Sequence, residues 1–222
     1  MPKDAWEKLP TEKRAAIESA AMDEFVSAGY EQASTNAIVK AAGISKGSLF
    51  YYFKGKADLY IYLIQRAQAS ASADFELFRG EWPADAIDRM RTLVEIGLKV
   101  HARNPKRARF LETLLDAPEM QQRLGGGMLM DGRQLFEAWF ADADTSRLRV
   151  NLSTMISLLY WTYTGLKMEL LASNSGTGEH GKGSDIPGIV DQMLQRFDKV
   201  IDALRWGTYE RDTGQGDHNG KS

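Results

Sequence analysis

Apolar residues in the first thirty positions recur at the spacing of a single helix face. The residues that set this spacing are Ile17, Ala21, Phe25 and Ala28. Residues three and four apart meet on one side of a helix, so the pattern predicts a helix from Thr11 to Ala28. Gly29 follows directly, and a glycine at this place is suited to the left-handed conformation that ends helices.

Two short helices with a glycine turn between them are predicted next. Ser34 or Thr35 can cap the first of them, which is expected to end at Gly43. Ser45 can cap the second, which is expected to run through Tyr52. Two short helices joined in this way are typical of a helix-turn-helix.

Six further helices are predicted from apolar stripes whose ends coincide with proline or glycine. Their expected ranges are 56–79, 87–103, 107–115, 129–140, 148–171 and 186–204. Proline cannot continue a helix that precedes it, and Pro83, Pro105 and Pro118 each fall at a boundary. No alternation of apolar and polar residues is long enough to predict a strand. The sequence therefore predicts an all-α fold with about nine helices.

The last two predicted helices have the most apolar surface. The helix over 148–171 is apolar on nearly every side, so we expect it to be buried within its own domain or covered by another subunit. The helix over 186–204 places apolar residues at alternating spacings of four and three, which indicates a seam for other helices. Together they predict a homodimer held by a four-helix bundle across a twofold axis.

Length and composition narrow the class of protein. A chain of 222 residues has room for two domains, which we expect over 1–55 and 56–207, followed by a disordered tail over 208–222. The absence of cysteine excludes disulfide scaffolds, thiolate zinc sites and cysteine nucleophiles. The first ten residues lack the apolar core of a signal peptide, and no apolar run approaches the length of a membrane span. These features predict a cytoplasmic protein without a membrane partner.

Charge is distributed unevenly although the formal net charge is only -2. The segment from Gln32 to Ala57 contains four lysines and no acidic residue, whereas Asp and Glu make up 30 of the 222 residues overall. This positive field falls on the predicted helix-turn-helix, in which the second helix can enter a major groove while the first crosses the backbone. The segment therefore predicts a site for double-stranded DNA.

Individual residues of this segment suit contacts with DNA. Gly47, in the first turn of the second helix, would let its backbone approach the duplex closely. Tyr51 and Tyr52 can each offer a hydroxyl to a phosphate. Lys54 and Lys56 lie at the start of the following helix, where the helix dipole disfavours cations unless an external anion is also present. An ordinary helical hairpin, with solvated lysines and aromatic residues in a core, is the alternative interpretation.

The amino-acid sequence of this segment resembles the DNA-binding signature of the TetR family over about 50 residues. The matching positions are Gly29-Tyr30, Ser34-Thr35, Ile38, Ala42-Gly43-Ile44-Ser45, Lys46-Gly47, Leu49-Phe50, Tyr52-Phe53, Lys56 and Leu59. The resemblance implies a helix-turn-helix repressor whose larger domain dimerises and binds an effector that releases the operator. Phe50 and Tyr52 depart from the family, which usually has tyrosine and histidine there, so the operator cannot be taken from a relative.

The resemblance also implies roles for individual residues. Thr35 would cap its helix and touch a phosphate, Leu49 and Phe53 would belong to the core, and Phe50 would make an apolar contact. The positions expected at DNA are Ser34, Thr35, Ser45, Lys46, Gly47, Ser48, Phe50, Tyr51, Tyr52, Lys54 and Lys56.

Large apolar or aromatic residues on the later helices are candidates for the effector pocket. They are Met90, Val94, His101, Phe110, Leu114, Phe136, Met155, Leu159, Trp161 and Tyr163. Each of them can equally be an ordinary core residue. A pocket of this composition would be mostly apolar, with polar anchors such as His101 or Tyr163, and would suit a lipid-like or aromatic molecule.

Other functions are less well supported by the sequence. The segment from Gly176 to Gly183 nearly spells a phosphate-binding loop, but Gly183 stands where a magnesium-binding hydroxyl is required, and a helix precedes it instead of a strand. The three histidines are far apart, so we expect no metal, and no catalytic set is recognisable, so we expect neither a cofactor nor an enzyme. A helical adaptor that binds protein through its last helix is the remaining alternative.

Overall fold

The computed structural model describes residues 4–124, 138–148, 150–173 and 186–206, and every regular element among them is a helix. The helices are α1 (Asp4–Glu7), α2 (Thr11–Gln32), α3 (Thr35–Ala41), α4 (Lys46–Tyr52), α5 (Lys56–Phe78), α6 (Ala86–Arg103), α7 (Pro105–Glu112), α8 (Pro118–Arg123), α10 (Leu152–Ser173) and α11 (Ile186–Trp206). The predicted all-α fold is confirmed. Helices α1 and α8 were not predicted, because neither is long enough to show a period.

Glycine and serine set the ends of the first helices. Gly29 has a φ of 70° and interrupts α2 as predicted, although the chain resumes helical geometry as far as Gln32. Gly43 has a φ of 65° and makes the turn between α3 and α4. Ser34 is the N-cap of α3, and Thr35 is its first helical residue, so the expectation that Thr35 caps this helix is wrong.

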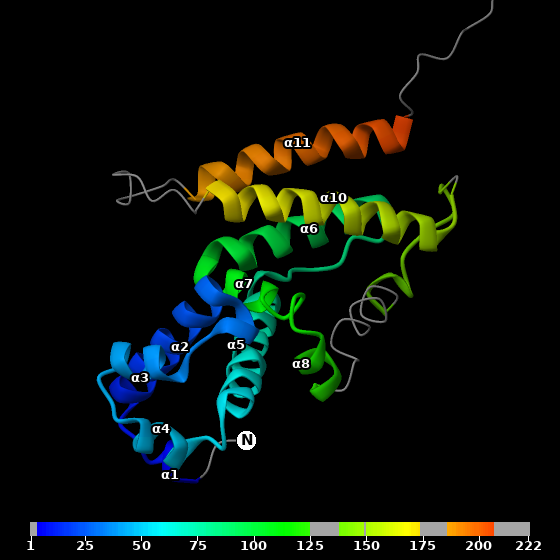
Figure 1. Cartoon of the computed structure of the whole chain (residues 1–222). Coiled ribbons are helices and arrows are strands. Elements are labelled where there is room, and N and C mark those ends of the chain that lie inside the picture. Colours follow the sequence, from blue (N-terminus) through cyan, green and yellow to red (C-terminus); the bar gives the residue numbers. More distant parts are fainter. Residues whose placement is uncertain (1–3, 125–137, 149, 174–185, 207–222) are drawn as a thin grey trace, which may run out of the picture.

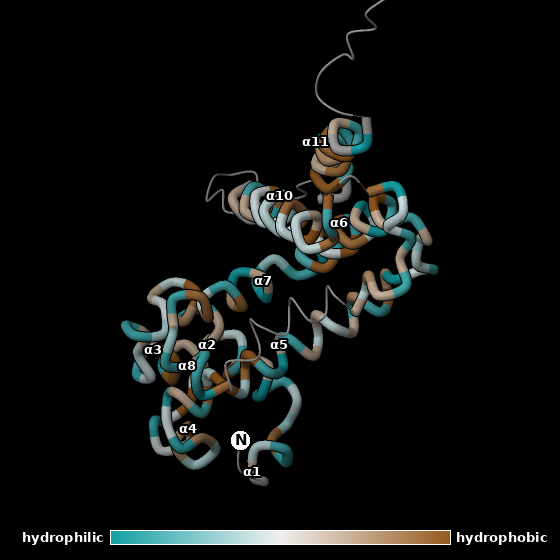
Figure 2. The backbone as a smooth tube through the Cα atoms, turned by 90° about the vertical axis from the view of Figure 1, so that its right-hand side faces the viewer, coloured by the Kyte–Doolittle hydropathy of each residue, from teal (hydrophilic) through white to brown (hydrophobic). Residues whose placement is uncertain are grey.

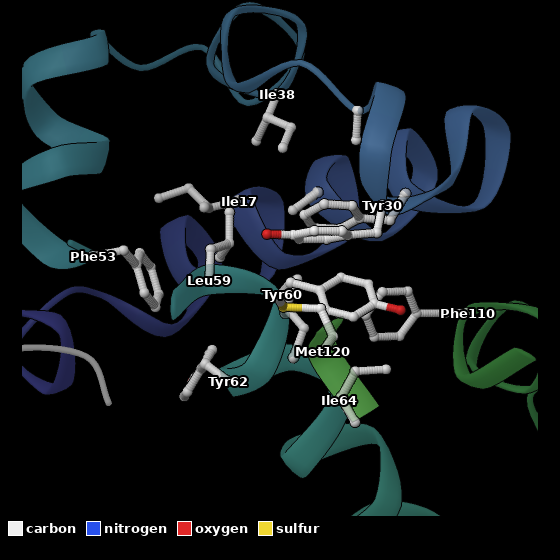
Figure 3. Close-up of a cluster of buried hydrophobic side chains, with 14 of the residues drawn as sticks. Ile17, Tyr30, Ile38, Phe53, Leu59, Tyr60, Tyr62, Ile64, Phe110 and Met120 are labelled. Carbon is white, nitrogen blue, oxygen red and sulfur yellow. The ribbon is translucent and has the colours of Figure 1, made fainter. Parts of the chain in front are cut away.

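The first of two buried clusters holds α1 to α5 together with α7 and α8 (Figure 3). Phe25, Tyr60 and Phe110 form an aromatic centre, in which the ring centroid of Tyr60 lies 4.8 Å from that of Phe25 and 5.5 Å from that of Phe110. Met120 brings α8 into the same cluster. Residues as late as 120 thus complete the core around the first helices, whereas the sequence led us to expect this domain within 1–55.

The second buried cluster lies among α6, α10 and α11 (Figure 2). Helix α6 lies against both α10 and α11, and its buried residues include Met90 and Val94. Phe197 of α11 and Leu159 of α10 are almost fully buried against them. This cluster supplies the interior of the larger helical part of the protein.

Helices α5 and α7 join the two clusters (Figure 1). The guanidinium of Arg107 on α7 is nearly buried, and it lies 2.6 Å from the carboxylate of Asp74 on α5. The same side chain donates to the carbonyl of Val100, near the end of α6. A buried arginine that satisfies groups on two other helices holds all three in one arrangement.

One face of α10 is uncovered. Tyr160, Trp161 and Met168 have 55 %, 67 % and 56 % of their surface exposed. A helix that is apolar on nearly every side was expected to be buried in its own domain or covered by another subunit, and the single chain leaves this face without cover. None of the helices in the described part of the chain combines the length and hydropathy of a membrane span.

Several expectations fall on residues outside the described ranges. They concern most of the helix expected over 129–140, the loop around Gly176 to Gly183, and the tail over 208–222. Phe136 also lies outside the described residues.

Candidate functional site

Helix α4 begins with a well-formed cap. The Ser45 side chain accepts from the backbone N–H of Ser48 at 3.0 Å, and the two hydroxyl oxygens lie 2.8 Å apart. Because a serine cap satisfies an N–H group that has no partner inside the helix, it fixes where the helix starts. The cap therefore places Lys46 and Gly47 in the first turn.

The residues of α4 divide into a buried and an exposed face. Leu49 is 2 % exposed and Phe53, just after the helix, is 1 % exposed, so the expectation that both belong to the core is confirmed. Phe50 and Tyr51 are 38 % and 60 % exposed on the other side. The Nζ of Lys46 lies 6.0 Å from the centroid of the Phe50 ring. The exposed face thus combines a cation with two aromatic rings.

Trp6, which the sequence analysis did not single out, packs beneath α4. Its ring is fully buried, and its centroid lies 5.5 Å from that of Tyr52 and 4.9 Å from that of Phe53. Its Nε1 donates to the hydroxyl of Tyr62, which donates in turn to the carboxylate of Glu18. Burial raises the pKa of the Tyr62 phenol, so this donor stays protonated. A lone tryptophan in a polar segment was the only signal of this role.

The lysines of the segment differ in their surroundings. Lys40, Lys46 and Lys54 are exposed. Lys56 is instead held against α2, because its Nζ donates to the carbonyl of Glu31 at 2.9 Å and lies 4.8 Å from the centroid of the Tyr30 ring.

The start of α5 also differs from the expectation. Asp58 accepts from the backbone N–H of Lys54 at 3.2 Å, which brings an acidic side chain to the first turn of the helix. An anion of the chain itself therefore complements the helix dipole here, and the lysines do not require an external one. No cluster of three or more potential metal ligands is present within the described ranges.

The predicted DNA contacts lie on three neighbouring elements. Ser34 and Thr35 are half-buried at the start of α3, where the backbone N–H of Ser34 also donates to the Glu24 carboxylate. Ser45 and Lys46 begin α4, and Tyr52 at its end is half-buried. The exposed surface of α4 and its flanking residues, made of Ser45, Lys46, Gly47, Phe50, Tyr51 and Lys54, is called the α4 face below.

No contact inside the protein requires a glycine at position 47. A Cβ built on it would meet only the Ser45 hydroxyl, at the ordinary contact distance of 3.8 Å. Glycine within a helix costs roughly 0.5–1 kcal/mol relative to alanine. The residue therefore lowers the stability of α4 without relieving any contact in the chain.

A cavity of about 390 Å³ lies between α5, α6 and α10. Its lining is formed by Ala71, Ser72, Phe75, Glu76, Leu93, Val94, Gly97, Val100, His101, Trp139, Leu159 and Tyr163. Four of the ten effector candidates are therefore brought together here: Val94, His101, Leu159 and Tyr163. Trp139 was not a candidate, although it lies within a segment that was predicted to be helical.

The other effector candidates lie elsewhere. Met90 and Met155 are buried in the same core cluster but do not line the cavity. Phe110 and Leu114 belong to the first cluster, among the helices around α4. Trp161 is 67 % exposed on the uncovered face of α10. Helical periodicity did not indicate which of these residues would line the cavity, join a core cluster or remain exposed.

Contacts of α6 and α7 link the cavity to α2. His101 and Arg107 lie near the junction of α6 and α7, and Arg107 also holds Asp74 of α5, one residue before the cavity wall at Phe75. The next link is Lys106, whose Nζ donates to the Ser19 hydroxyl at 2.8 Å and lies 2.7 Å from the Asp23 carboxylate. These contacts connect α6 to α2 through α7.

Comparison with known proteins points to one family. Residues 17–63 match the family described as bacterial regulatory proteins, tetR family. The HTH-type transcriptional regulator RutR of Escherichia coli (strain K12) is 32 % identical over 119 residues, covering 52 % of this chain and 55 % of that protein. A regulator of the same type from Staphylococcus aureus (strain USA300) is 46 % identical over 55 residues, covering 25 % and 30 %. The chain thus matches about half the length, or less, of these curated relatives.

Solved structures resemble nearly the whole chain. A TetR family transcriptional regulator from Chloroflexus aurantiacus J-10-FL superposes with a TM-score of 0.68 at 26 % identity, covering 95 % of this chain and 100 % of that one. The fatty acid degradation regulator FadR from Bacillus halodurans gives 0.50 at 18 % identity, covering 88 % and 99 %, and shares the fold. The likeness therefore extends through the cavity-bearing helices.

Proposed function

Because the chain belongs to the TetR family of bacterial regulatory proteins, we propose that it is a DNA-binding repressor that leaves its operator when a small effector binds. The observation that carries this proposal is the α4 face, where Lys46 and Tyr51 are exposed on a helix whose other side is anchored by Leu49. A short helix held rigidly from behind can present its outer residues to base edges and phosphates in a major groove. Operator binding would place the protein in the cytoplasm.

Two copies are needed for a palindromic operator. The uncovered apolar face of α10 supports a homodimer, formed with α11 as a four-helix bundle around a twofold axis. Such a dimer would carry two α4 helices about 34–36 Å apart, the separation of successive major grooves. The operator is therefore expected to be an inverted repeat.

Effector entry would favour a state in which the two α4 helices no longer match the grooves. The cavity borders α5 and α6, and Arg107 and Lys106 connect these helices to α2. A coupling of roughly 1–3 kcal/mol between cavity and DNA would change operator affinity about 5- to 150-fold. The effector acts only if it binds the released state more tightly than the DNA-bound state.

Selection of binding sites from random duplex DNA tests the proposal directly. We expect an inverted repeat to be enriched and its affinity to fall steeply with salt. Lys46→Ala and Tyr51→Ala should each weaken binding by roughly 5- to 150-fold, and Lys46→Ala should lower the salt slope by about one if the lysine contacts a phosphate. Lys99→Ala is the matched control, because Lys99 pairs with Glu95 on α6, away from the α4 face. A helical adaptor would enrich no sequence, and its variants would behave like the parent.

Gly47→Ala separates a DNA-binding helix from an ordinary hairpin. The substitution should raise the free energy of unfolding by about 0.5–1 kcal/mol, because the site has space for a methyl group and alanine favours helix. Operator affinity should nevertheless fall, and Gly47→Ser and Gly47→Leu should lower it further as the side chain grows. Urea unfolding and fluorescence anisotropy with labelled operator measure the two quantities. Gains in stability with unchanged affinity across the series would contradict close approach of DNA at this residue.

A further inference from the structure

The cavity between α5, α6 and α10 restricts the size and the polarity of the molecules that can bind in it. Its volume of about 390 Å³ is near the lower end of ligand pockets, which span roughly 300–1,000 Å³. Leu93, Val94 and Leu159 give it an apolar floor from α6 and α10. The ligand must therefore be small, and most of its surface must be apolar.

One wall of the cavity contains two aromatic rings. The rings of Phe75 and Trp139 are stacked, with centroids 4.8 Å apart and planes inclined by 10°. The buried Arg89 guanidinium donates to the Trp139 carbonyl at 2.8 Å, which fixes the backbone of this wall. A fixed aromatic wall packs well against another flat ring, because offset stacking and edge contacts add to the burial of apolar area.

The cavity lining also contains a polar pair, which is formed by His101 and Tyr163. The Nδ1 of His101 lies 2.8 Å from the Gly97 carbonyl oxygen and 3.0 Å from the Tyr163 hydroxyl oxygen. A carbonyl oxygen only accepts, so Nδ1 must carry a proton and donate it. The Tyr163 hydroxyl can then accept from the same N–H, which leaves its own proton for another partner. The pair therefore offers the hydroxyl proton of Tyr163 as a donor.

Burial keeps both members of this pair uncharged near neutral pH. It lowers the pKa of His101 and raises that of Tyr163, whose phenol is also disfavoured from ionising by the Glu112 carboxylate. The two cations whose charges act on His101 are already paired: Lys167 lies 3.0 Å from the carboxylate of Glu112, and Arg107 is paired with a carboxylate on α5.

At the rim of the cavity, Glu76 lies 2.9 Å from the Arg79 guanidinium. An ionised carboxylate in this cavity would lose its hydration without gaining an unpaired cation, which is costly. A cationic amine would likewise find the Glu76 carboxylate at the rim already paired with Arg79.

We propose that the effector of this protein is an uncharged, flat, mainly apolar molecule with one hydroxyl group, which accepts a hydrogen bond from Tyr163. The ring of such a molecule would lie against Phe75 and Trp139. This inference rests on the proposed function only in that ligand entry is taken to release DNA. The recognition chemistry itself belongs to the cavity and can be measured without DNA.

Four naphthalene derivatives of similar size test the charge and the hydroxyl separately. Binding of 2-naphthol, naphthalene, 2-naphthoate and protonated 2-naphthylmethylamine to the full chain is measured by isothermal titration calorimetry at neutral pH. We expect 2-naphthol to bind most tightly, at least tenfold more tightly than either charged compound. Naphthalene should bind more weakly than 2-naphthol by about fivefold to tenfold, because the buried hydrogen bond from Tyr163 is missing.

Tyr163→Phe tests whether the Tyr163 hydroxyl forms a hydrogen bond with the hydroxyl group of the ligand. The variant keeps the ring, whose removal would disturb the core, and should bind 2-naphthol and naphthalene almost equally. Lys99→Ala is the control, since Lys99 pairs with Glu95 on α6 and does not line the cavity. Gly97→Ala gives a second variant, because a Cβ there would come within 2.6 Å of the Tyr163 ring and push it into the cavity. This variant should weaken all four compounds.

The outcomes distinguish this inference from the proposed function. Tighter binding of the carboxylate or of the amine, equal binding of 2-naphthol by Tyr163→Phe and the parent, or no binding of any compound would each overturn the assignment of the effector class. In all these cases operator selection could still succeed, and the repressor proposal would stand. Selective 2-naphthol binding by a chain that enriches no DNA sequence would support the cavity chemistry and contradict the repressor proposal.

Discussion

Replacing Trp6 with alanine is expected to lower the free energy of unfolding by about 3–5 kcal/mol, the range for removing a large aromatic residue from a core. The Trp6 ring is fully buried, and the rings of Tyr52, Phe53 and Tyr62 surround it with centroids 4.9–5.7 Å away. The substitution also leaves the Tyr62 hydroxyl without the hydrogen bond from Nε1, which is 2.8 Å long. Urea unfolding followed by far-UV circular dichroism measures the loss.

The loss should extend to DNA binding, because the residues that contact Trp6 are those that hold α4 from behind. Trp6→Phe is the matched variant: it keeps an aromatic ring, lacks the Nε1 donor, and should lose clearly less stability than Trp6→Ala. Conditions under which Trp6→Ala is still folded allow operator affinity to be compared with that of the parent. A change below about 1 kcal/mol for Trp6→Ala would show that the α1 segment does not hold α4 in solution.

Replacing Trp161 with glutamate is expected to convert the proposed dimer into monomers. Trp161 is 67 % exposed in the single chain, and Tyr160 and Met168 extend the same uncovered face of α10. Tryptophan is enriched among the residues that dominate binding energy at protein interfaces, where its loss costs about 2 kcal/mol or more. Glutamate also brings charge into an interface that would otherwise be apolar. Analytical ultracentrifugation over a range of concentrations should show a dimer for the parent and a monomer for the variant.

Operator affinity should fall with the dimer, because each half-site is then bound separately. Leu77→Glu is the matched control: Leu77 is a large apolar residue with 63 % exposure on α5, outside the proposed interface, and should leave both measurements unchanged. A parent chain that is monomeric at all concentrations, or a Trp161→Glu variant that remains dimeric, would contradict the proposed interface.

Local sequence signals predicted most of the helices, and the family resemblance implied which side of α4 is buried. The Ser45 cap, the break at Gly29 and the turn at Gly43 were expected from single residues, and the structure contains all three. Leu49 and Phe53 are buried as the family resemblance implied. These features follow from backbone geometry and from spacing within one or two helical turns, which a short stretch of sequence contains.

Contacts between distant parts of the chain were not predictable in the same way. Lys56, one of the positions expected at DNA, donates to a carbonyl 25 positions earlier in the chain, and no local signal indicated this contact. Phe110 was expected near the effector, but it packs among the helices around α4. Periodicity indicates that a residue lies on the buried side of its helix. It does not indicate which other helix covers that side.

The sequence by itself determined an all-helical chain with a helix-turn-helix near its start, because caps, glycines, prolines and apolar spacing act locally. Tertiary structure decided that Trp6 reaches Tyr62 across 56 positions and that Tyr163 reaches His101 across 62. It likewise decided which candidates share the cavity and which apolar face of α10 remains uncovered. The physical reason is that burial of a helix face is encoded within that helix, whereas its partner depends on how all the helices fill space together.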